Sequence, residues 1–215
     1  MRDELFKLII DQLASVPRTG GRKGFNGALF LNAYGEPTLD KKIVERVDYA
    51  NKTLPDAKIG FFSNGDHLTA GLYDNLIEAG IDEIVVTVHD PDNFNEELYN
   101  LSEAPGRNVL RIHDPLTYLS NRGGQIDVPE ENLIAPKNRC ISPTYAFWIS
   151  SDGQMLMCFN DSLLEFPIGV IGDGHDNIWD IWDSPEYRQL RKNLRSGELD
   201  NLPDLCYKCR IPNKD

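Results

Sequence analysis

The chain carries four cysteines, and their spacing suggests metal binding. Cys206 and Cys209 form a C-x2-C pair, which lets one short turn present two thiolates to a metal centre. Cys140 and Cys158 lie 18 positions apart, and two apolar runs between them flank the turn sequence Ser-Asp-Gly. This pattern predicts a β-hairpin, whose open end brings residues of both strands together. We therefore expect all four thiolates to converge on one site.

Composition and length indicate a globular chain that needs no disulfides to fold. Its 215 residues are 40% hydrophobic, enough for one large or two small domains. The formal net charge of −12 argues against binding bare nucleic acid or an anionic membrane surface. No segment approaches the roughly 20 apolar residues that span a bilayer, and residues 1–17 lack signal-peptide features. We expect a cytoplasmic protein, in which such cysteines are metal ligands or catalysts more often than disulfides.

The elements that must position these residues fall into two regions. Apolar periodicity predicts helices over residues 2–13, 40–53, 68–80 and 96–101, and strands over 28–33, 58–62, 83–90 and 108–115. This alternation predicts an α/β fold with a parallel sheet, open or closed into a barrel. A loop-rich linker over 116–139 separates this core, residues 1–115, from a second domain over 140–215. The second domain is expected to hold the hairpin and a helical segment over 176–199.

Polar residues gather at the predicted strand ends, where ligands of such sheets bind. The clusters are Tyr34–Pro37, Ser63–His67, His89–Asn93 and His113–Pro115. The two His-Asp-Pro triplets could face a substrate, but this sequence also ends strands in turns, and we favour the turn. In the second region, a set of aromatic residues is expected to pack the small domain and shield its metal site: Tyr145, Phe147, Trp148, Trp179 and Trp182.

The cysteine spacing resembles the twitch or SPASM extension of radical S-adenosylmethionine (SAM) enzymes. Cys140 is followed by twelve residues, then Gly153, four residues and Cys158, and a long gap precedes Cys206-x2-Cys209. In that family such cysteines hold an auxiliary 4Fe-4S cluster. The resemblance implies one such cluster on these four residues, because the two-cluster form needs seven cysteines. Zinc and unliganded thiols are the alternatives, although structural zinc sites usually pair two close-spaced turns.

The N-terminal region is similar to the same family. Tyr34–Pro37 (YGEP) resembles the G-G-E-P segment at a strand end, and residues 61–89 resemble the strand, turn and helix that follow. Residues 119–126 (LSNRGGQI) resemble a linker motif before such extensions. The resemblance implies a partial radical SAM β/α barrel in which Gly35, Glu36 and Pro37 hold the amino group of SAM. It further implies that Ser63 and Asn64 face the ribose. Alternatively, the Glu36 carboxylate only stabilises a helix N-terminus.

The motif C-x3-C-x2-C, which binds the family's radical-generating cluster, is absent, since no cysteine precedes Cys140. We expect the chain to begin downstream of that motif and to be unable to cleave SAM alone. It is then a fragment, a subunit whose partner supplies the missing cluster or electrons, or a degenerate member. The first two imply SAM-dependent radical modification or oxidation of a peptide, sugar or other small substrate. The third implies an iron–sulfur binding or electron-transfer protein, and a zinc-stabilised binding module is the remaining alternative.

Overall fold

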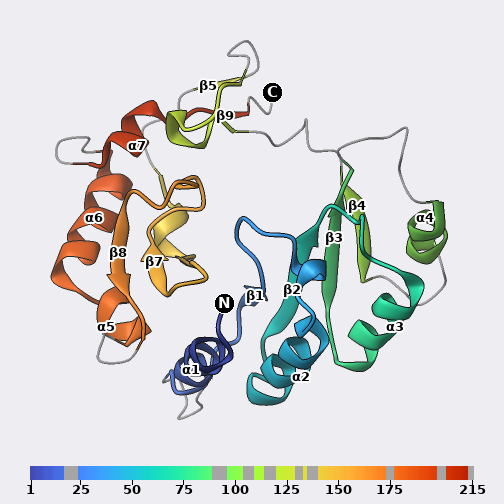
Figure 1. Cartoon of the computed structure of the whole chain (residues 1–215). Coiled ribbons are helices and arrows are strands. Elements are labelled where there is room, and N and C mark those ends of the chain that lie inside the picture. The colour runs from blue at the N-terminus through green and yellow to red at the C-terminus, as the bar shows by residue number, and fades with distance from the viewer. Residues whose placement is uncertain are drawn as a thin grey trace. The chain divides into compact units, whose positions relative to one another are not determined.

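In the computed structural model the chain divides into two compact units (Figure 1). One comprises Leu13–Pro115, and the other comprises Met1–Gln12 together with Leu116–Asp215. The structure describes residues 1–16, 24–88, 96–103, 109–113, 120–128, 133–134, 140–172, 177–197 and 202–212. The boundaries predicted for the core, the linker and the small domain stay a prediction, and residues 1–12 are grouped with the second unit.

The first unit is built on a four-stranded parallel sheet in the order β1-β2-β3-β4. Its strands are β1 (Ala28–Phe30), β2 (Lys58–Ser63), β3 (Glu83–Thr87) and β4 (Leu110–His113). The two central strands bury alternate apolar side chains: Ile59, Phe61, Ile84 and Val86 are fully buried, whereas Phe62 of β2 is 45% exposed. The predicted α/β class is therefore confirmed.

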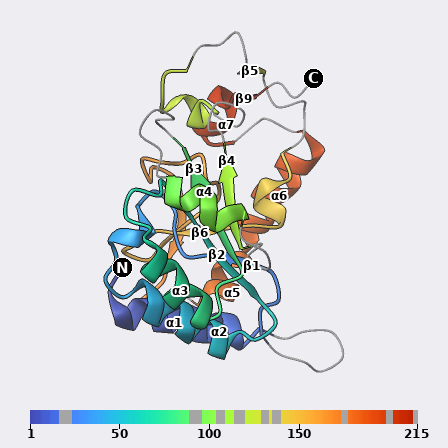
Figure 2. The ribbon, with the colours of Figure 1, turned by 90° about the vertical axis from the view of Figure 1, so that its right-hand side faces the viewer.

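Helices connect successive strands of this sheet. They are α2 (Ile43–Thr53), α3 (Ala70–Glu78) and α4 (Glu96–Glu103), and a 3-10 turn, η2 (Pro37–Leu39), precedes α2. Figure 2 shows α3 and α4 in front of the strands. Parallel neighbours require such crossovers, because the chain must return to the same end of the sheet before the next strand starts. The carboxyl ends of the strands therefore share one edge.

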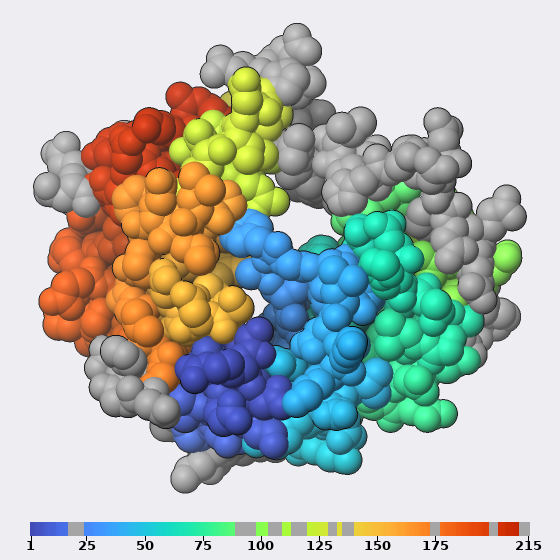
Figure 3. Space-filling view, viewed as in Figure 1, coloured from blue at the N-terminus to red at the C-terminus, as the bar shows by residue number. Residues whose placement is uncertain are grey.

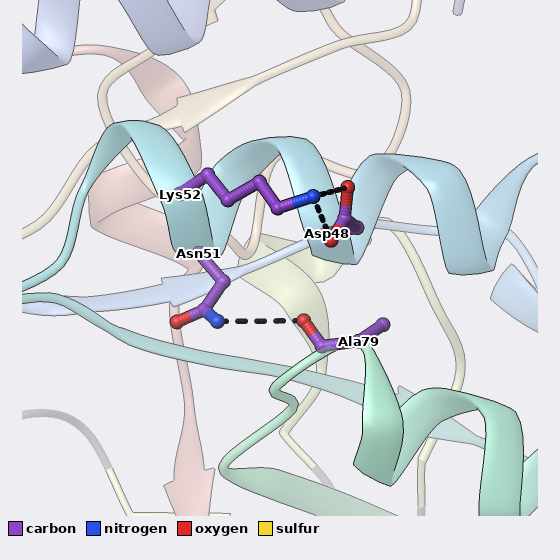
Figure 4. A network of polar contacts seen from close by, with 4 residues as sticks. All are labelled: Asp48, Asn51, Lys52 and Ala79. Atoms are coloured by element: carbon purple, nitrogen blue, oxygen red, sulfur yellow. Dashed lines mark hydrogen bonds and ion pairs between the residues drawn. The ribbon is translucent and has the colours of Figure 1, made fainter.

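The contact between α2 and α3 explains one glycine. Asn51 of α2 donates a hydrogen bond of 3.4 Å from Nδ2 to the carbonyl oxygen of Ala79 at the end of α3 (Figure 4). Gly80 follows with φ +89°, and a Cβ there would lie 2.1 Å from Asn51 Nδ2. Only glycine allows this stop of α3 against α2. On the exposed side of α2, Lys52 pairs with Asp48 at 2.8 Å.

The second unit combines short antiparallel strands with helices. Strands β6 (Trp148–Ile149), β7 (Gln154–Leu156) and β8 (Pro167–Val170) form one sheet, and β5 (Leu133–Ile134) pairs with β9 (Ile211–Pro212). The helices are α1 (Asp3–Ala14), α5 (Ile178–Trp182), α6 (Pro185–Ser196) and α7 (Asp204–Lys208). Two 3-10 turns, η5 (Arg122–Gly124) and η7 (Ser142–Thr144), complete it. The predicted hairpin is confirmed, with β8 as a third strand.

The single helical segment expected over residues 176–199 is interrupted. Ser184 accepts the backbone N–H of Tyr187 at 3.2 Å and caps a new helix, and Pro185 occupies its first turn. This capping sequence starts α6 afresh after α5 has ended, because proline fits the first helical turn but not a helix interior. Among the described residues, no helix is both long and apolar enough to cross a membrane.

Candidate functional site

The four cysteines lie in the second unit as free, partly buried thiols. Cys206 belongs to α7 and Cys209 is its C-cap residue, so one helical turn presents both. Cys158 follows β7 by two residues. Cys140 precedes η7, and its backbone N–H donates to the carbonyl oxygen of Leu194 in α6 at 3.1 Å. Three separate segments of the chain therefore supply the four sulfur atoms.

The contacts that position Cys140 differ from the predicted ones. The β6–β7 ladder pairs Trp148 with Leu156 and Ile149 with Met155, so it ends well before Cys140. The residues between are taken up by η7 and by the loop before β6, and α6 fixes the backbone of Cys140. The hairpin thus positions Cys158, whereas helix packing positions Cys140.

Gly153 makes the hairpin turn possible. Its N–H donates to the carbonyl oxygen of Ser150 at 3.1 Å, and its φ is +93°. A Cβ at this position would lie 2.2 Å from the backbone oxygen of Ile171. The residue must therefore be glycine both for its left-handed conformation and for the close approach of the chain after β8. The glycine in the cysteine spacing pattern consequently has a structural reason.

The four thiols influence one another electrostatically. The pKa of Cys158 is raised to about 12, mainly by burial and in smaller part by the negative charges of Cys140 and Cys209. Burial likewise raises the pKa of Cys206 to about 12, with added contributions from the other three thiols. The pKa of Cys209 is also raised, first by burial and then by Cys140. These groups thus share one partly buried site, and a bound cation must replace their protons.

The arrangement of the thiols bears on which metal they suit. No three His, Cys, Asp or Glu side chains of the described residues are arranged around a single metal ion. A zinc ion needs its thiolates within about 2.3 Å of one point. An iron–sulfur cluster binds each thiolate through a different iron atom and so holds them further apart. The four coupled thiols supply the ligand set that a 4Fe-4S cluster takes, and the zinc alternative finds no support.

Two buried polar residues follow Cys158 directly, and sequence reasoning missed both. Asn160 is 4% exposed; its backbone N–H lies 3.4 Å from Cys158 Sγ and its Nδ2 lies 3.7 Å from Cys209 Sγ. Ser120 donates from its hydroxyl to Asn160 Oδ1 at 2.8 Å. Asp161, fully buried, accepts the backbone N–H groups of Glu165 and Phe166. The sequence did contain a signal for these two residues, because a pair of polar residues closely follows the expected ligand Cys158.

The described part of the linker motif, residues 120–126, holds the C-x2-C turn in place. Asn121 Oδ1 accepts the backbone N–H of Arg210 at 2.7 Å, and its Nδ2 donates to the carbonyl oxygen of Lys208 at 2.8 Å. Gly123 has φ +66°, and a Cβ there would lie 2.1 Å from Leu205 Cδ1. In Figure 3 these yellow-green linker residues lie directly against the red residues of α7. The motif therefore fixes the segment that carries Cys206 and Cys209.

Apolar side chains also pack against two of the thiols. Met157, Tyr187 and Leu205 form a buried cluster, against which Cys158 and Cys206 pack. Other side chains that pack on it are Phe166, Ile168, Trp182 and Leu190. Such a shell limits solvent access and thereby tunes a metal site. Among the aromatic residues expected to form the shield, the prediction was wrong for Tyr145, which is 71% exposed.

In the first unit, Glu36 connects two strand ends. Its Oε1 accepts the Ser63 hydroxyl at 2.7 Å and the backbone N–H and hydroxyl of Thr38, and its Oε2 accepts the Asn64 N–H at 2.8 Å. Burial raises the pKa of Glu36, but these hydrogen bonds outweigh that effect and hold the pKa below its usual value. The carboxylate is thus ionised, caps η2, and joins the loop after β1 to the end of β2.

The residues near Glu36 differ in how closely other atoms pack around them. Pro37 is buried under the start of η2, and Ser63 is 4% exposed and also accepts the Gly65 N–H at 3.0 Å. A Cβ built at Gly35 meets no atom within 4 Å, so packing of the chain does not require a glycine there. Space beside this backbone is what a bound cofactor would need. The SAM-binding roles assigned to Gly35, Glu36, Pro37, Ser63 and Asn64 stay predictions.

The structure describes only His113 of the two His-Asp-Pro triplets, and only its backbone. His89 and the rest of its triplet lie outside the described residues. His113 ends β4, which pairs in parallel with β3, but its side chain is likewise outside the description. A role for either histidine at a site therefore stays a prediction.

Comparison with known proteins agrees with this geometry. Residues 140–210 match SPASM, an iron–sulfur cluster-binding domain. Over 212 residues the chain is 30% identical to the S-adenosyl-L-methionine-dependent 2-deoxy-scyllo-inosamine dehydrogenase of Niallia circulans, covering 97% of this chain and 80% of that protein. The chain therefore belongs to the radical SAM family with a SPASM domain, as the resemblance implied.

Two solved structures support the same assignment. The crystal structure of BtrN in complex with AdoMet and 2-DOIA matches with a TM-score of 0.80 and 28% identity, covering 97% of this chain and 80% of BtrN. The structure of selenomethionine BtrN in an open conformation matches with a TM-score of 0.70 and 25% identity, covering 96% and 78%. The family fold expected from the sequence is thus confirmed, and its SPASM domain is of the iron–sulfur binding kind.

Proposed function

We propose that this chain serves the SAM-dependent oxidation of a small polyhydroxylated substrate of the sugar or aminocyclitol class. One observation carries the proposal: four electrostatically coupled thiols lie together inside the region that matches an iron–sulfur binding domain. The substrate class is suggested by the relative named as a 2-deoxy-scyllo-inosamine dehydrogenase. Oxidation of an alcohol to a ketone removes two electrons and two protons. When bound, an iron–sulfur cluster would accept one of the two electrons, and abstraction of a hydrogen atom by a SAM-derived radical would account for the other.

The protein's own residues would bind and orient the reactants. A 4Fe-4S cluster would be held by the four thiolates of Cys140, Cys158, Cys206 and Cys209. The buried side chains of Met157, Tyr187 and Leu205 would limit the access of water to it. In the first unit, the Glu36 carboxylate keeps the loop after β1 against the end of β2. The backbone around Gly35 then keeps its shape for the amino group of SAM. The open space at Gly35 supports this assignment.

The cluster assignment is tested by anaerobic reconstitution with iron and sulfide. We expect the wild-type chain to gain a visible absorbance band with matching iron and sulfide content, and Cys206→Ser to lose most of both. Tyr207→Phe is the matched control, since it changes the adjacent, partly exposed residue but no sulfur ligand. A colourless protein that retains zinc would refute the proposal.

The SAM and substrate assignments are tested on the reconstituted chain by calorimetric titration. We expect SAM to bind the wild type and to bind Gly35→Phe at least about tenfold more weakly, because a large side chain would fill the open space beside the loop. We also expect 2-deoxy-scyllo-inosamine to perturb the electron paramagnetic resonance (EPR) spectrum of the reduced cluster. Equal SAM affinity in the two proteins would contradict the proposed cofactor site.

A second function is favoured by the distribution of cysteines. All four lie at or after Cys140, and the SPASM match accounts for them. We therefore propose that the residues of this chain do not cleave SAM by themselves and that radical chemistry needs a further segment or a partner polypeptide to supply the SAM-cleaving cluster. Without either, the chain would be an iron–sulfur binding or electron-transfer protein. Incubation with SAM and a strong reductant tests this: formation of 5′-deoxyadenosine by the chain alone would disprove it.

A further inference from the structure

Asn160 is placed to act on two sulfur ligands at once. Its backbone N–H approaches Cys158 Sγ at 3.4 Å, and its side-chain Nδ2 approaches Cys209 Sγ at 3.7 Å. Both distances are in the range of hydrogen bonds to sulfur, whose radius exceeds that of oxygen. Cys158 and Cys209 come from distant parts of the chain, so the contact depends on the folded unit. One residue thus donates to thiols that two different segments supply.

The orientation of the Asn160 amide is set by a third segment. Ser120, 7% exposed, donates its hydroxyl to Asn160 Oδ1 at 2.8 Å and also lies 3.4 Å from the Arg122 backbone N–H. A thiolate can only accept a hydrogen bond, so the NH2 group must face Cys209 and the oxygen must face Ser120. Asn160 is itself 4% exposed, so water does not compete strongly for the amide. The donor is therefore preorganised.

From this geometry we infer that Asn160 tunes the reduction potential of the cluster that the four cysteines hold. The inference rests on the proposed cluster assignment. Reduction adds negative charge to a cluster and its thiolates, and N–H donors stabilise the more negative state. Hydrogen bonds to the sulfur atoms are among the factors that set such potentials. Asn160 therefore makes the cluster easier to reduce, which suits a site that accepts an electron during substrate oxidation.

The test compares midpoint potentials of reconstituted proteins by redox titration monitored with EPR. Asn160→Leu removes the side-chain donor but keeps the backbone donor to Cys158. We expect the ratio of reduced to oxidised cluster at the wild-type midpoint to fall about tenfold, which is about 59 mV for one electron. Asn160→Asp should shift the potential further in the same direction, because a carboxylate adds negative charge beside Cys209.

Ser162→Ala is the matched control. Ser162 lies in the same turn as Asn160. The substitution removes the hydrogen bond from Ser162 Oγ to Gln125 Oε1 at 2.8 Å, which involves no sulfur atom. The potential of this variant should equal that of the wild type. A merely structural role of Asn160 would change cluster retention and leave the potential of the retained cluster unchanged, and that result would overturn the inference.

A second measurement covers the case in which the Asn160 variants bind no cluster. Pulsed EPR of the reduced wild type, with asparagine side chains labelled with ¹⁵N, should detect coupling of the electron spin to an amide nitrogen. Absence of this coupling in a cluster-bearing protein would refute the role of Asn160 while the proposed function stands. A wild-type protein that takes up no iron and sulfide would overturn the proposed function and the inference with it.

Discussion

At the scale of single residues, Glu36 shows how one carboxylate can organise a strand edge. Its two oxygens accept four hydrogen bonds, from Thr38, Ser63 and Asn64. Two of these partners, Ser63 at the end of β2 and Asn64 directly after it, lie 27 and 28 residues further along the chain. The interaction confirms that Glu36 caps the turn η2, and it adds a contact between neighbouring strand ends.

The pKa of Glu36 leads to a prediction about pH. Because the folded pKa lies below the ordinary value of 4.5, the stabilisation by this carboxylate is present above pH 4.5 and is lost as pH falls through the folded pKa. Glu36→Gln should lack this part of the pH dependence and should be less stable than the wild type at neutral pH. Urea unfolding between about pH 3 and pH 7 measures the difference. If the free energy of unfolding changed equally with pH in the two proteins, the stabilising role of the Glu36 carboxylate would be contradicted.

A pair of glycines gives a second prediction at this scale. Gly153→Ala should destabilise the second unit by at least about 1–3 kcal/mol, because alanine is strained at positive φ and its Cβ meets the Ile171 carbonyl. Gly35→Ala is the control, since its Cβ would meet nothing within 4 Å. Thermal unfolding of both variants checks the contrast. An equal loss of stability in the two would show that the close approach at Gly153 is unimportant.

At the scale of elements, the linker motif acts as a clamp on α7. Asn121 exchanges hydrogen bonds with the backbone on both sides of Cys209, and Gly123 lets η5 touch Leu205. A short helix such as α7, of five residues, has little stability of its own. The turn that presents Cys206 and Cys209 therefore depends on packing against the linker.

Removing this clamp should loosen the C-x2-C turn. Asn121→Ala deletes the hydrogen bonds to Lys208 and Arg210, each worth about 0.5–1.5 kcal/mol. We expect faster hydrogen exchange at the Arg210 amide and faster loss of the cluster to a chelator. Gln189→Ala, which removes a side-chain bond to Asn193 on exposed α6, should leave both rates unchanged. Unchanged rates in Asn121→Ala would contradict the role of the linker.

At the scale of the whole molecule, the two units have different sources of stability. The first has an apolar sheet core around Ile59 and Ile84, whose side chains are fully buried. The second consists of short strands and helices. Its thiols come from three segments and pack beside the small apolar group of Met157, Tyr187 and Leu205. A cluster bound to those thiols would cross-link the segments. Metal and folding are therefore expected to be coupled in the second unit only.

Removal of the cluster tests this difference. Oxidation followed by chelation should increase hydrogen exchange in residues 140–172 and 202–212 and lower the melting temperature of the second unit. The strands of the first unit, β2 and β3, should keep their protection. Reconstitution with iron and sulfide should restore the second unit. Equal loss of protection in both units would show that the cluster is not a local cross-link.

Much of the fold could be predicted from the sequence because local patterns carry it. The alternation of apolar strands with amphipathic helices predicted the parallel sheet, and the two apolar runs that flank Ser-Asp-Gly predicted the hairpin. Positional detail was harder to predict. The start of α6 at Ser184 and the position of Cys140 outside the ladder both depend on capping and helix packing. Apolar periodicity alone does not reveal such capping and packing contacts.

By itself, the sequence determined the class of protein, since helix and strand periods and ligand spacing are properties of neighbouring residues. Only the tertiary structure decided which polar groups meet. The contacts of Asn160 with Cys209 and of Glu36 with Ser63 join residues 49 and 27 positions apart. Hydrogen bonds act over about 3 Å and need a particular direction. Packing of the folded units alone brings such distant groups within that range.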